Sequence, residues 1–558
     1  MLKEEVLTIL KSIGIAASIE DLEEPKEEFG DVAFPCFKLA KEQRKNPVEI
    51  AKEVAKKIPV SKHPLLLKVE ARGGYVNFFF YWEKIMENIL KQFFRKSKPR
   101  ESKRIMVEFS QPNPVHSMHI GHARSTFLGD SLANIYELLG NKVIRANYIN
   151  NVGLQVAKLV TAYLLWGKNK RPKGKPDRWL WEFYVKFHEE AKKDPSLEDR
   201  AREILKKFES NEDKKIVRVW NKLVRWCVKG FKETYKQLGI RFDVYLYEKD
   251  FRNLGKELVN KAIMKGIAFK SLDNTIVANL EKYGLPNCVM LRSDGTGLYL
   301  TSDLGMTVYK FKKYKLDEAV WVVASAQDLY FKQLFKILEL LDYKWVKNCH
   351  HFSFNLVRLL EGKMSSREGR AIMLDEVIKE LIRLAYDEVN KRNPKLEKRK
   401  KLKIAKIIGI GALKYSILKI EPEDTITFDW KQMLSLKGNT APYLQYAYTR
   451  CSGILRKAKK WKITLRINKL TNEEKQLLKT LAKFYSIVKS AAKDMRPHYI
   501  CNYCYELATN FDKFYEFCPV LKAEDKNVKN FRLTLVQIVR DVLKTSLNLL
   551  GIKTLERM

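Results

Sequence analysis

The chain has 558 residues, of which 46% are hydrophobic, so it is long enough and apolar enough to form several globular domains. Lysine and arginine number 105 against 66 aspartate and glutamate residues, a formal net charge of +39. This excess favours a polyanionic partner such as nucleic acid, although a heavily solvated surface is the plainer alternative. Eight scattered cysteines argue against a disulfide framework, and the lack of an 18-residue apolar run argues against a membrane protein. The first residues are amphipathic and partly acidic, unlike a signal peptide, so we expect a cytoplasmic protein.

Residues 1–100 predict a small α+β unit. Helical periodicity runs through "EEVLTILKSI" and "NPVEIAKEVAKKI", whereas "LLLKVEA" and "YVNFFFYW" have the pattern of strands. After a basic linker, a strand from residue 104 leads through a Pro/Asn turn into a helix and then the strand "KVIRANYINN". This βαβ order predicts a doubly wound parallel sheet.

Residues 165–260 show no clear strand signal and contain long charged helices, which predicts an inserted helical module. Strand signals return at "TIVANL", "CVMLRSDGTGLYLTSD" and "EAVWVVAS", and after about residue 365 the pattern is mostly helical. The basic run at 390–406 fits a solvated helix and an RNA-facing surface equally well. Cys501 and Cys504 have no second pair at zinc spacing, so we expect them on a helix and not in a metal site.

The stretch "VEFSQPNPVHSMHIGHARSTFLGD" places His116, His119 and His122 three residues apart where a helix is predicted to begin. Zinc would need further ligands that this spacing does not supply. A helix N-terminus offers N–H groups and a positive dipole end to phosphate, and imidazoles can donate to a phosphate oxygen as charge builds. Gly121 leaves room for a base or ribose. A short histidine motif at a helix start could also simply cap and pack.

A second stretch, "LEGKMSSREGRAI", combines lysine, arginine and two serines between glycines. Cations together with hydroxyl and backbone donors suit a triphosphate, although an ordinary basic surface loop has the same composition.

In this order and on a βαβ frame, the two stretches resemble the HIGH and KMSKS signatures of class I aminoacyl-tRNA synthetases, the second altered to "KMSSR". Over essentially the whole chain the sequence is similar to the arginyl-tRNA synthetase family, through "FGDVAFPCFKLAK", "GGYVNFFF", "EFSQPN", "GLYLTSDLG", "VVASAQDLY", "FDWKQMLSLKGNTAPYLQYAYTR" and "LLGIKTLERM". The resemblance implies a Rossmann-type catalytic domain with a helical insertion, an α+β N-terminal domain and an all-helical anticodon-binding domain. The expected boundaries are 1–100 for the N-terminal domain, 101–365 for the catalytic domain with its insertion at about 160–260, 366–430 for the KMSKS loop and connecting helices, and 431–558 for the anticodon-binding domain.

The resemblance also implies a step of translation. L-Arginine would react with ATP, assisted by Mg²⁺ and dependent on tRNA, to give arginyl-adenylate, and the arginyl group would pass to the 3′ end of tRNA(Arg). We therefore expect a cytoplasmic monomer with no organic cofactor, no structural zinc and no membrane partner.

Site roles follow from the same resemblance. In the nucleotide site, His119 and His122 would steady the α-phosphate, alongside His116 and Gly121; the pyrophosphate would be held by Lys363 and Arg367, in the loop with Met364, Ser365 and Ser366. The arginine pocket would use Tyr299, Asp303 and Gln327 for the guanidinium, and Glu108 and Asn113 for the α-amino and carboxylate end. The expected tRNA contacts are Tyr75, Asn77, Tyr446, Tyr515 and Met558.

The sequence departs from the family pattern in two ways. Arg367 replaces the second lysine of KMSKS, and His116 occupies the position before HIGH where family members that lack this lysine often carry another one. In "QYAYTR", Tyr448 stands where a histidine is common. The first departure leaves open which residue supplies the missing charge.

The arginine pocket also has a physical rationale, because a carboxylate pairs bidentately with a planar guanidinium. Asp303 follows Tyr299 by four residues, so both would face one side of a helix that starts near Ser302. Core packing for Tyr299 and a helix cap for Asp303 are the plainer alternatives. Three other functions remain possible: a class I synthetase for another amino acid, a small nucleotidyltransferase, or a catalytically inactive RNA-binding relative.

Overall fold

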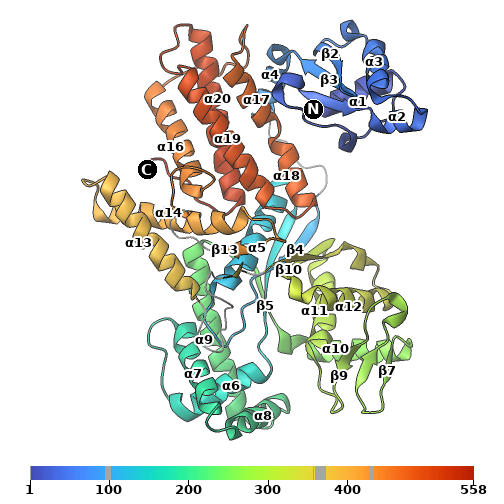
Figure 1. Ribbon diagram of the computed structural model, residues 1–558. Helices are drawn as coiled ribbons and strands as arrows, with labels where there is room; N and C mark the ends of the chain where they lie inside the picture. The colour runs from blue at the N-terminus through green and yellow to red at the C-terminus, as the bar shows by residue number, and fades with distance from the viewer. Residues whose placement is uncertain (1, 95–101, 356, 359–371, 428–432) are drawn as a thin grey trace. The chain divides into compact units, whose positions relative to one another are not determined.

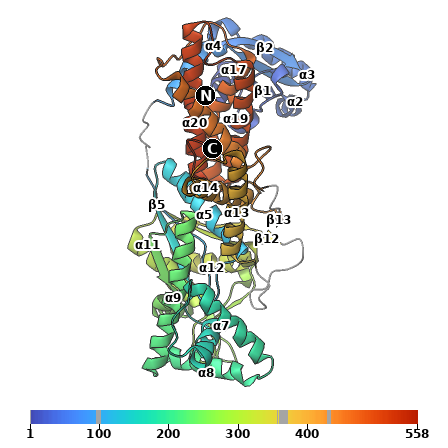
Figure 2. The ribbon, with the colours of Figure 1, turned by 90° about the vertical axis from the view of Figure 1, so that its left-hand side faces the viewer.

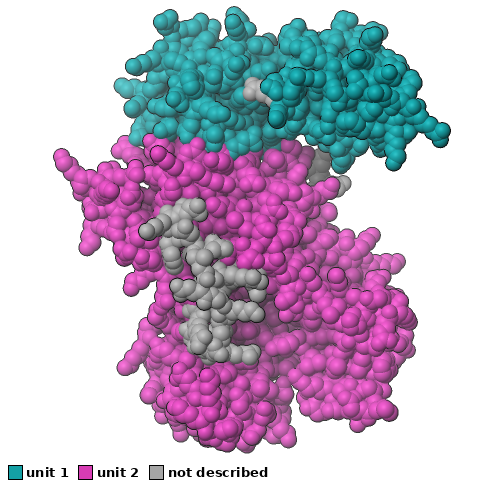
Figure 3. All heavy atoms as spheres, viewed as in Figure 1, with its two compact units in different colours: residues 1–97, 450–485, 506–542 teal, residues 98–449, 486–505, 543–558 magenta. Residues whose placement is uncertain are grey.

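The computed structural model describes residues 2–94, 102–355, 357–358, 372–427 and 433–558. Contacts divide the chain into two compact units, which Figure 3 colours separately. Unit 1 contains residues 1–97, 450–485 and 506–542, and unit 2 contains residues 98–449, 486–505 and 543–558. Each unit thus combines segments that are far apart in the chain.

Unit 1 contains a small antiparallel sheet in the order β1-β3-β2. Its strands are β1 (Val32–Pro35), β2 (Leu66–Arg72) and β3 (Tyr75–Phe80). The helices of its N-terminal part are α1 (Leu2–Ser12), α2 (Phe37–Gln43), α3 (Pro47–Lys57) and α4 (Trp82–Lys91). Helices α1 and α3 pack on the sheet, and α4 packs against α17 (Asn472–Ala482). The expected α+β character of the N-terminal region is confirmed.

Unit 2 is built on a five-stranded sheet in the order β11-β10-β4-β5-β6, in which every neighbouring pair is parallel. Its strands are β4 (Arg104–Glu108), β5 (Lys142–Ile149), β6 (Val244–Tyr247), β10 (Glu318–Ala324) and β11 (Cys349–Phe354). Helix α5 (Ile120–Leu138) connects β4 to β5. The chain therefore builds outward from β4 in one direction and later returns to its other side, as the predicted doubly wound sheet requires.

A group of helices separates β5 from β6. They are α6 (Leu154–Ala162), a π-helical turn (Tyr163–Gly167), α7 (Pro176–Ala191), α8 (Ser196–Glu209) and α9 (Lys214–Leu238), and both views show α7, α8 and α9 gathered together (Figures 1 and 2). The expectation that residues 165–260 contain no strand was wrong, because β6 lies within them. This strand is four residues long and pairs only with β5 at the edge of the sheet, so its sequence signal is short.

After β6 come α10 (Arg252–Met264), an antiparallel sheet of β7 (Ala268–Lys270), β8 (Ile276–Ala278) and β9 (Cys288–Leu291), then α11 (Tyr299–Tyr314) and α12 (Asp328–Leu340). The predicted strand "CVMLRSDGTGLYLTSD" was therefore right only at its start, because a helix begins at Tyr299. Beyond residue 365 the described residues are mostly helical, as predicted, but β13 (Ile426–Thr427) pairs in parallel with β12 (Val357–Arg358). The basic run at 390–406 covers the end of α13 (Leu374–Arg392) and the start of α14 (Lys398–Leu418).

Four helices of the C-terminal region contain residues of both units: α16 (Ala441–Ala458), α18 (Phe484–Lys493), α19 (His498–Phe517) and α20 (Lys526–Leu549). Cys501 and Cys504 lie on α19 and are fully buried, in agreement with the helical position expected for them. Among the described residues, no helix combines the length and the apolar character needed to cross a membrane.

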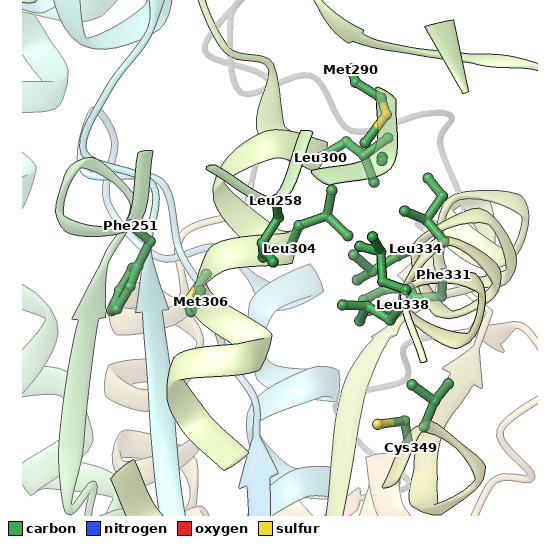
Figure 4. Close-up of a cluster of buried hydrophobic side chains, with 14 of the residues drawn as sticks. Phe251, Leu258, Met290, Leu300, Leu304, Met306, Phe331, Leu334, Leu338 and Cys349 are labelled. Atoms are coloured by element: carbon green, nitrogen blue, oxygen red, sulfur yellow. The ribbon is translucent and has the colours of Figure 1, made fainter. Parts of the chain in front are cut away.

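The apolar core of unit 2 holds α11 between α10 and α12. Leu300 and Leu304 of α11 lie near Leu258 of α10 and face the α12 side chains Leu334 and Leu338 (Figure 4). Helices α10 and α11 approach closely at Gly305, where an added Cβ would lie 2.6 Å from the backbone nitrogen of Gly255. This packing fixes the position of the first turns of α11, which carry two of the expected arginine-binding residues.

Candidate active site

Two expected site residues of unit 2 lie at or just beyond the carboxyl ends of the neighbouring strands β4 and β10. Glu108 ends β4, and Gln327 ends a short 3-10 helix, Ser325–Gln327, that follows β10. These neighbouring strands lead to connections on opposite sides of the sheet, and in open parallel sheets such a switch point forms a crevice where ligands bind. The fold therefore provides a candidate ligand site near the histidine motif.

The histidine motif forms the beginning of α5. His119 is the N-cap, and its Nδ1 accepts a hydrogen bond of 3.1 Å from the backbone N–H of Gly121. The backbone N–H of His119 in turn donates to Nδ1 of His122 at 3.2 Å. Because both Nδ1 atoms accept hydrogen bonds, the proton of each neutral imidazole must lie on Nε2. The cap thus fixes the tautomer of both rings and leaves each with one Nε2–H donor.

Burial keeps the three histidines uncharged. It lowers the pKa of His119 to about 3, with a further contribution from His116, and lowers the pKa of His122 well below its ordinary value. The ring centroids of His119 and His122 are 3.8 Å apart. Near pH 7, these imidazoles can therefore contact a phosphate only as neutral N–H donors.

His116 lies close to both rings, with centroids 5.7 Å from His119 and 5.3 Å from His122. Its Nδ1 lies 3.1 Å from the carbonyl oxygen of Ser117, which can only accept. Burial lowers the pKa of His116 as well. A neutral ring cannot supply the positive charge of the lysine missing from the second signature, so the geometry does not favour His116 as its replacement.

The second signature, Lys363, Met364, Ser365, Ser366 and Arg367, lies outside the described residues. The chain that follows it is bonded to the histidine motif. The backbone N–H of Ile120 donates to the carbonyl of Ile372 at 3.1 Å, and that of Leu374 donates to Met118 at 2.9 Å. The described chain next to the second signature therefore adjoins the start of α5.

Asp303 of α11 lies in an acidic environment, here called the acidic pocket, because the charges of Glu108 and Glu248 act on it. Its carboxylate accepts a hydrogen bond from Tyr330 of α12, and Glu248 accepts one of 3.0 Å from Tyr148. Burial, together with the nearby charges of Glu108 and Glu248, raises the pKa of Asp303 to about 7, although Tyr330 and Lys310 act in the opposite direction. Three carboxylates near one another in a buried place make the pocket favourable for a cation.

Glu108 already has a cationic partner. Nζ of Lys310 forms an ion pair with one of its oxygens, and Nε2 of Gln111 donates to the other at 2.8 Å. Both Glu108 and Lys310 are almost fully buried. The pair neutralises one of the three carboxylates, and Glu248 forms a longer ion pair of 3.8 Å with Arg252. Among the described residues, Asp303 is therefore the member of the three that no ion pair neutralises, and it can face an incoming cation.

The remaining expected arginine contacts lie on exposed surface. Tyr299 is the first residue of α11 and 51% exposed, so the helix begins there and not near Ser302 as the sequence suggested. Its spacing of four residues from Asp303 still places both on one side of the helix. Gln327 and Asn113 are also exposed, the former before α12 and the latter in the turn before His116.

The sequence did not reveal several residues of this region. Tyr330 lies three residues after Gln327 in the motif "VVASAQDLY", but nothing in the sequence assigned it to the site. Glu248 follows the unpredicted strand β6. A strained turn was also missed: Ser110 and Gln111 have φ values of 78° and 48°, unusual for residues other than glycine. Ser110 Oγ lies 2.7 Å from the hydroxyl of Tyr235 on α9, so the inserted helices help to hold the turn that precedes the histidines.

The expected tRNA contacts of unit 1 lie in two places, and one of them, Asn77, is buried. Tyr75 and Asn77 of β3 line a cavity of about 300 Å³ together with Arg72 and Phe29, and the Arg72 guanidinium lies 4.3 Å from the centre of the Phe29 ring. Tyr75 also packs edge-on against Phe37. Tyr515 of α19 is 44% exposed, and Arg450 lies over its ring at 4.9 Å.

In unit 2, Tyr446 of α16 is partly exposed, with 39% of its surface accessible. Met558 packs partly buried against a small apolar cluster that includes Val389, Ile408 and Leu555. The Tyr448 side chain, at the position where a histidine is common, donates to Oε1 of Glu556 at 2.5 Å. Tyr448 therefore helps to hold the C-terminal segment, because its hydroxyl donates a hydrogen bond to that segment.

The catalytic frame and its site define a class of protein. The model of the family "tRNA synthetases class I (R), catalytic domain" matches residues 85–430, more than half of the chain. The model of the "Arginyl tRNA synthetase N terminal domain" matches residues 1–80, and the model of the "DALR anticodon binding domain" matches residues 444–558. The protein is a class I aminoacyl-tRNA synthetase.

Individual relatives narrow the class. The arginine–tRNA ligase of Clostridium beijerinckii is 36% identical, covering all of both chains, and that of Clostridium perfringens is 38% identical over 96% of this chain and 95% of its own. The solved arginyl-tRNA synthetase of Thermus thermophilus, 28% identical, aligns with a TM-score of 0.84 over 100% of this chain and 99% of its own. The chain belongs to the arginyl-tRNA synthetase family.

Proposed function

We propose that the acidic pocket around Asp303 takes the guanidinium of L-arginine, while the Nε2–H groups of His119 and His122 hold the α-phosphate of ATP. The activity to which these roles belong, arginine–tRNA ligation, follows from the family, as do ATP use and tRNA binding. The observation that carries the proposal is that the charges of Glu248 and Glu108 both act on Asp303, and that Glu108 ends β4 at the switch point of the sheet. The negative charge of these carboxylates suits a planar cation such as guanidinium.

Two steps complete the reaction in this proposal. A carboxylate oxygen of arginine attacks the α-phosphorus of ATP, the bond to the bridging oxygen breaks, and pyrophosphate leaves. The terminal adenosine hydroxyl of tRNA(Arg) then attacks the carbonyl carbon of arginyl-adenylate, and AMP leaves. Both steps depend mainly on positioning and on charge stabilisation, for which neutral donors in a dry site are well suited.

The ends of the substrates would be held by the other expected residues. Tyr299 and Gln327 border the guanidinium, and Glu108 and Asn113 hold the α-amino and carboxylate end. Gly121 would leave room for the adenosine. Lys363 and Arg367 of the second signature would bind the pyrophosphate. Among the described residues no group of three or more His, Cys, Asp or Glu side chains could hold a metal ion, so Mg²⁺ would arrive with the ATP phosphates.

The tRNA would contact residues in the N-terminal and the C-terminal regions of the chain. Tyr75 and Asn77 belong to the N-terminal domain of the family, and Tyr446, Tyr515 and Met558 to the anticodon-binding domain. Exposed aromatic rings among lysines suit unstacked bases. We further propose tRNA-dependent activation, a monomer, a cytoplasmic location and the four chain segments bounded at residues 100, 365 and 430.

Binding of arginine should depend on pH because the pKa of Asp303 lies at about 7 in the ligand-free protein. Below pH 7 the carboxyl is protonated and must lose its proton to pair with a guanidinium. The KM for arginine should therefore rise by up to about tenfold for each pH unit below 7. Because the pKa is raised above its ordinary value, ionisation destabilises the ligand-free protein as the pH rises towards 7, and bound arginine offsets this cost.

The KM for arginine between pH 5.5 and 8.5 would be measured in both the chain and its Asp303→Asn variant. The variant has no titrating carboxyl at this position, so its pH profile should be flat over the range. A wild-type KM that does not change across pH 7 would refute the assignment of Asp303 to the guanidinium.

The function is tested by aminoacylation of total tRNA with each labelled amino acid, ATP and Mg²⁺. Charging with arginine alone is the expected result. Charging with another amino acid would leave the fold and the nucleotide site intact but exclude a guanidinium pocket. Binding of tRNA without any charging would identify a catalytically inactive relative.

A further inference from the structure

Arg124 is fully buried, although it carries one of the largest polar side chains in the protein. It lies on α5, two residues after His122. Side chains two residues apart on a helix point in nearly opposite directions, so Arg124 extends from the side of α5 that faces away from the phosphate-binding imidazole. Burial lowers the pKa of its guanidinium to about 10, which still leaves it charged at neutral pH.

The guanidinium donates to four backbone carbonyls. Its NH1 group bonds to Asn355 at 2.5 Å and to Asp424 at 2.7 Å, and its NH2 group bonds to Glu421 at 2.7 Å and to Pro422 at 3.2 Å. The two acceptor segments are also joined directly, because the backbone N–H of Asn355 donates to the carbonyl of Pro422 at 2.8 Å. One side chain thus connects three segments separated by more than 60 residues in the sequence.

The acceptors lie at a particular place in the fold. Asn355 immediately follows β11 and comes two residues before β12, and Asp424 comes two residues before β13. The strands β12 and β13 pair with each other, so Arg124 ties α5 to the start of both strands of this small sheet. Only a planar guanidinium can serve four carbonyls from one position, since an ammonium has three donors on a single atom.

We infer that Arg124 is a positioning residue for adenylate formation, which sets α5, and with it His119 and His122, against the β12–β13 sheet. The inference rests on the proposed function because its readout is the rate of that reaction. Displacement of a reacting or stabilising group by about 1 Å can cost about a hundredfold in rate. Arg124 acts through α5 and touches no substrate itself.

The test compares Arg124→Lys with a matched control, Arg145→Lys. Arg145 is equally buried, and its guanidinium also bonds to α5, through Glu137 and Asn134, but near the far end of the helix. Each substitution keeps the positive charge of the side chain but replaces a buried planar guanidinium with an ammonium group. ATP–pyrophosphate exchange with tRNA present, the dissociation constant for arginine and thermal unfolding would be measured for both.

In Arg124→Lys we expect kcat per folded molecule to fall at least about tenfold further than in Arg145→Lys, with a higher KM for ATP. The dissociation constant for arginine should change less than about twofold, because Asp303 lies on another helix. Equal kcat values per folded molecule in the two variants would refute the inference. A wild-type chain that forms no arginyl-adenylate would instead refute the proposed function.

A second variant keeps the test valid if Arg124→Lys does not fold. Asp424→Gly leaves Arg124 intact but loosens the exposed turn at 421–424, which supplies three of the four carbonyls. It should change kcat and the KM for ATP in the same direction, by about threefold. Unchanged values in a folded Asp424→Gly protein would count against the inference.

Discussion

The variant Asp303→Asn should lose about a hundredfold to a thousandfold in kcat/KM for arginine in ATP–pyrophosphate exchange. Removing one member of a buried, hydrogen-bonded charge pair costs about 2–5 kcal/mol, and each factor of ten corresponds to about 1.4 kcal/mol. Asparagine keeps the size of the side chain and can still accept from Tyr330, so the pocket should remain folded. The loss would therefore report the missing charge.

Asp294→Asn is the matched control for this change. Asp294 lies nine residues earlier in the turn before α11, where its carboxylate accepts from the backbone N–H of Thr296 at 2.8 Å, outside the acidic pocket. Its kcat/KM for arginine should stay within about twofold of the wild-type value, as for most surface substitutions. If Asp303→Asn behaved like this control, the acidic pocket could not be the guanidinium site.

The variant His122→Gln should lower kcat of arginine activation by about a hundredfold to a thousandfold, the usual cost of removing one donor to a charge that develops in the transition state. Glutamine at this third helical position can still accept the N–H of His119 and so preserve the cap. The change removes only the Nε2–H donor from its place beside His119. The KM for arginine should change little, because Asp303 and Tyr299 lie on α11.

His350→Gln is the corresponding control, since His350 lies on β11, where its Nε2 is 3.7 Å from Glu318. Its kcat should equal that of the wild type. Single-turnover measurement of adenylate formation would separate the chemical step from product release. A normal rate of adenylate formation in His122→Gln would exclude a role for this imidazole at the α-phosphate.

Local sequence patterns determined the parts of this protein whose structure depends on near neighbours. The amphipathic periods that predict α1, α3 and α9 are present in the helices, and the spacing of His119 and His122 leads directly to the cap of α5. The family was also evident from the sequence, because several motifs occur in the required order. Each of these inferences uses residues that lie within a few positions of one another.

Tertiary structure decided which distant side chains meet and which of them carry a charge. Nothing in the sequence links Asp303 to Tyr330 and Glu248, because these contacts depend on how β6, α11 and α12 pack. The contacts of Arg124 with the carbonyls at 421–424 likewise depend on how α5 packs against the segment before β13. The neutral state of the histidines and the raised pKa of Asp303 likewise result from burial and from charges brought close by folding. Desolvation depends on everything that surrounds a group, so only the folded chain could assign neutral donors to one side of the site and a cation pocket to the other.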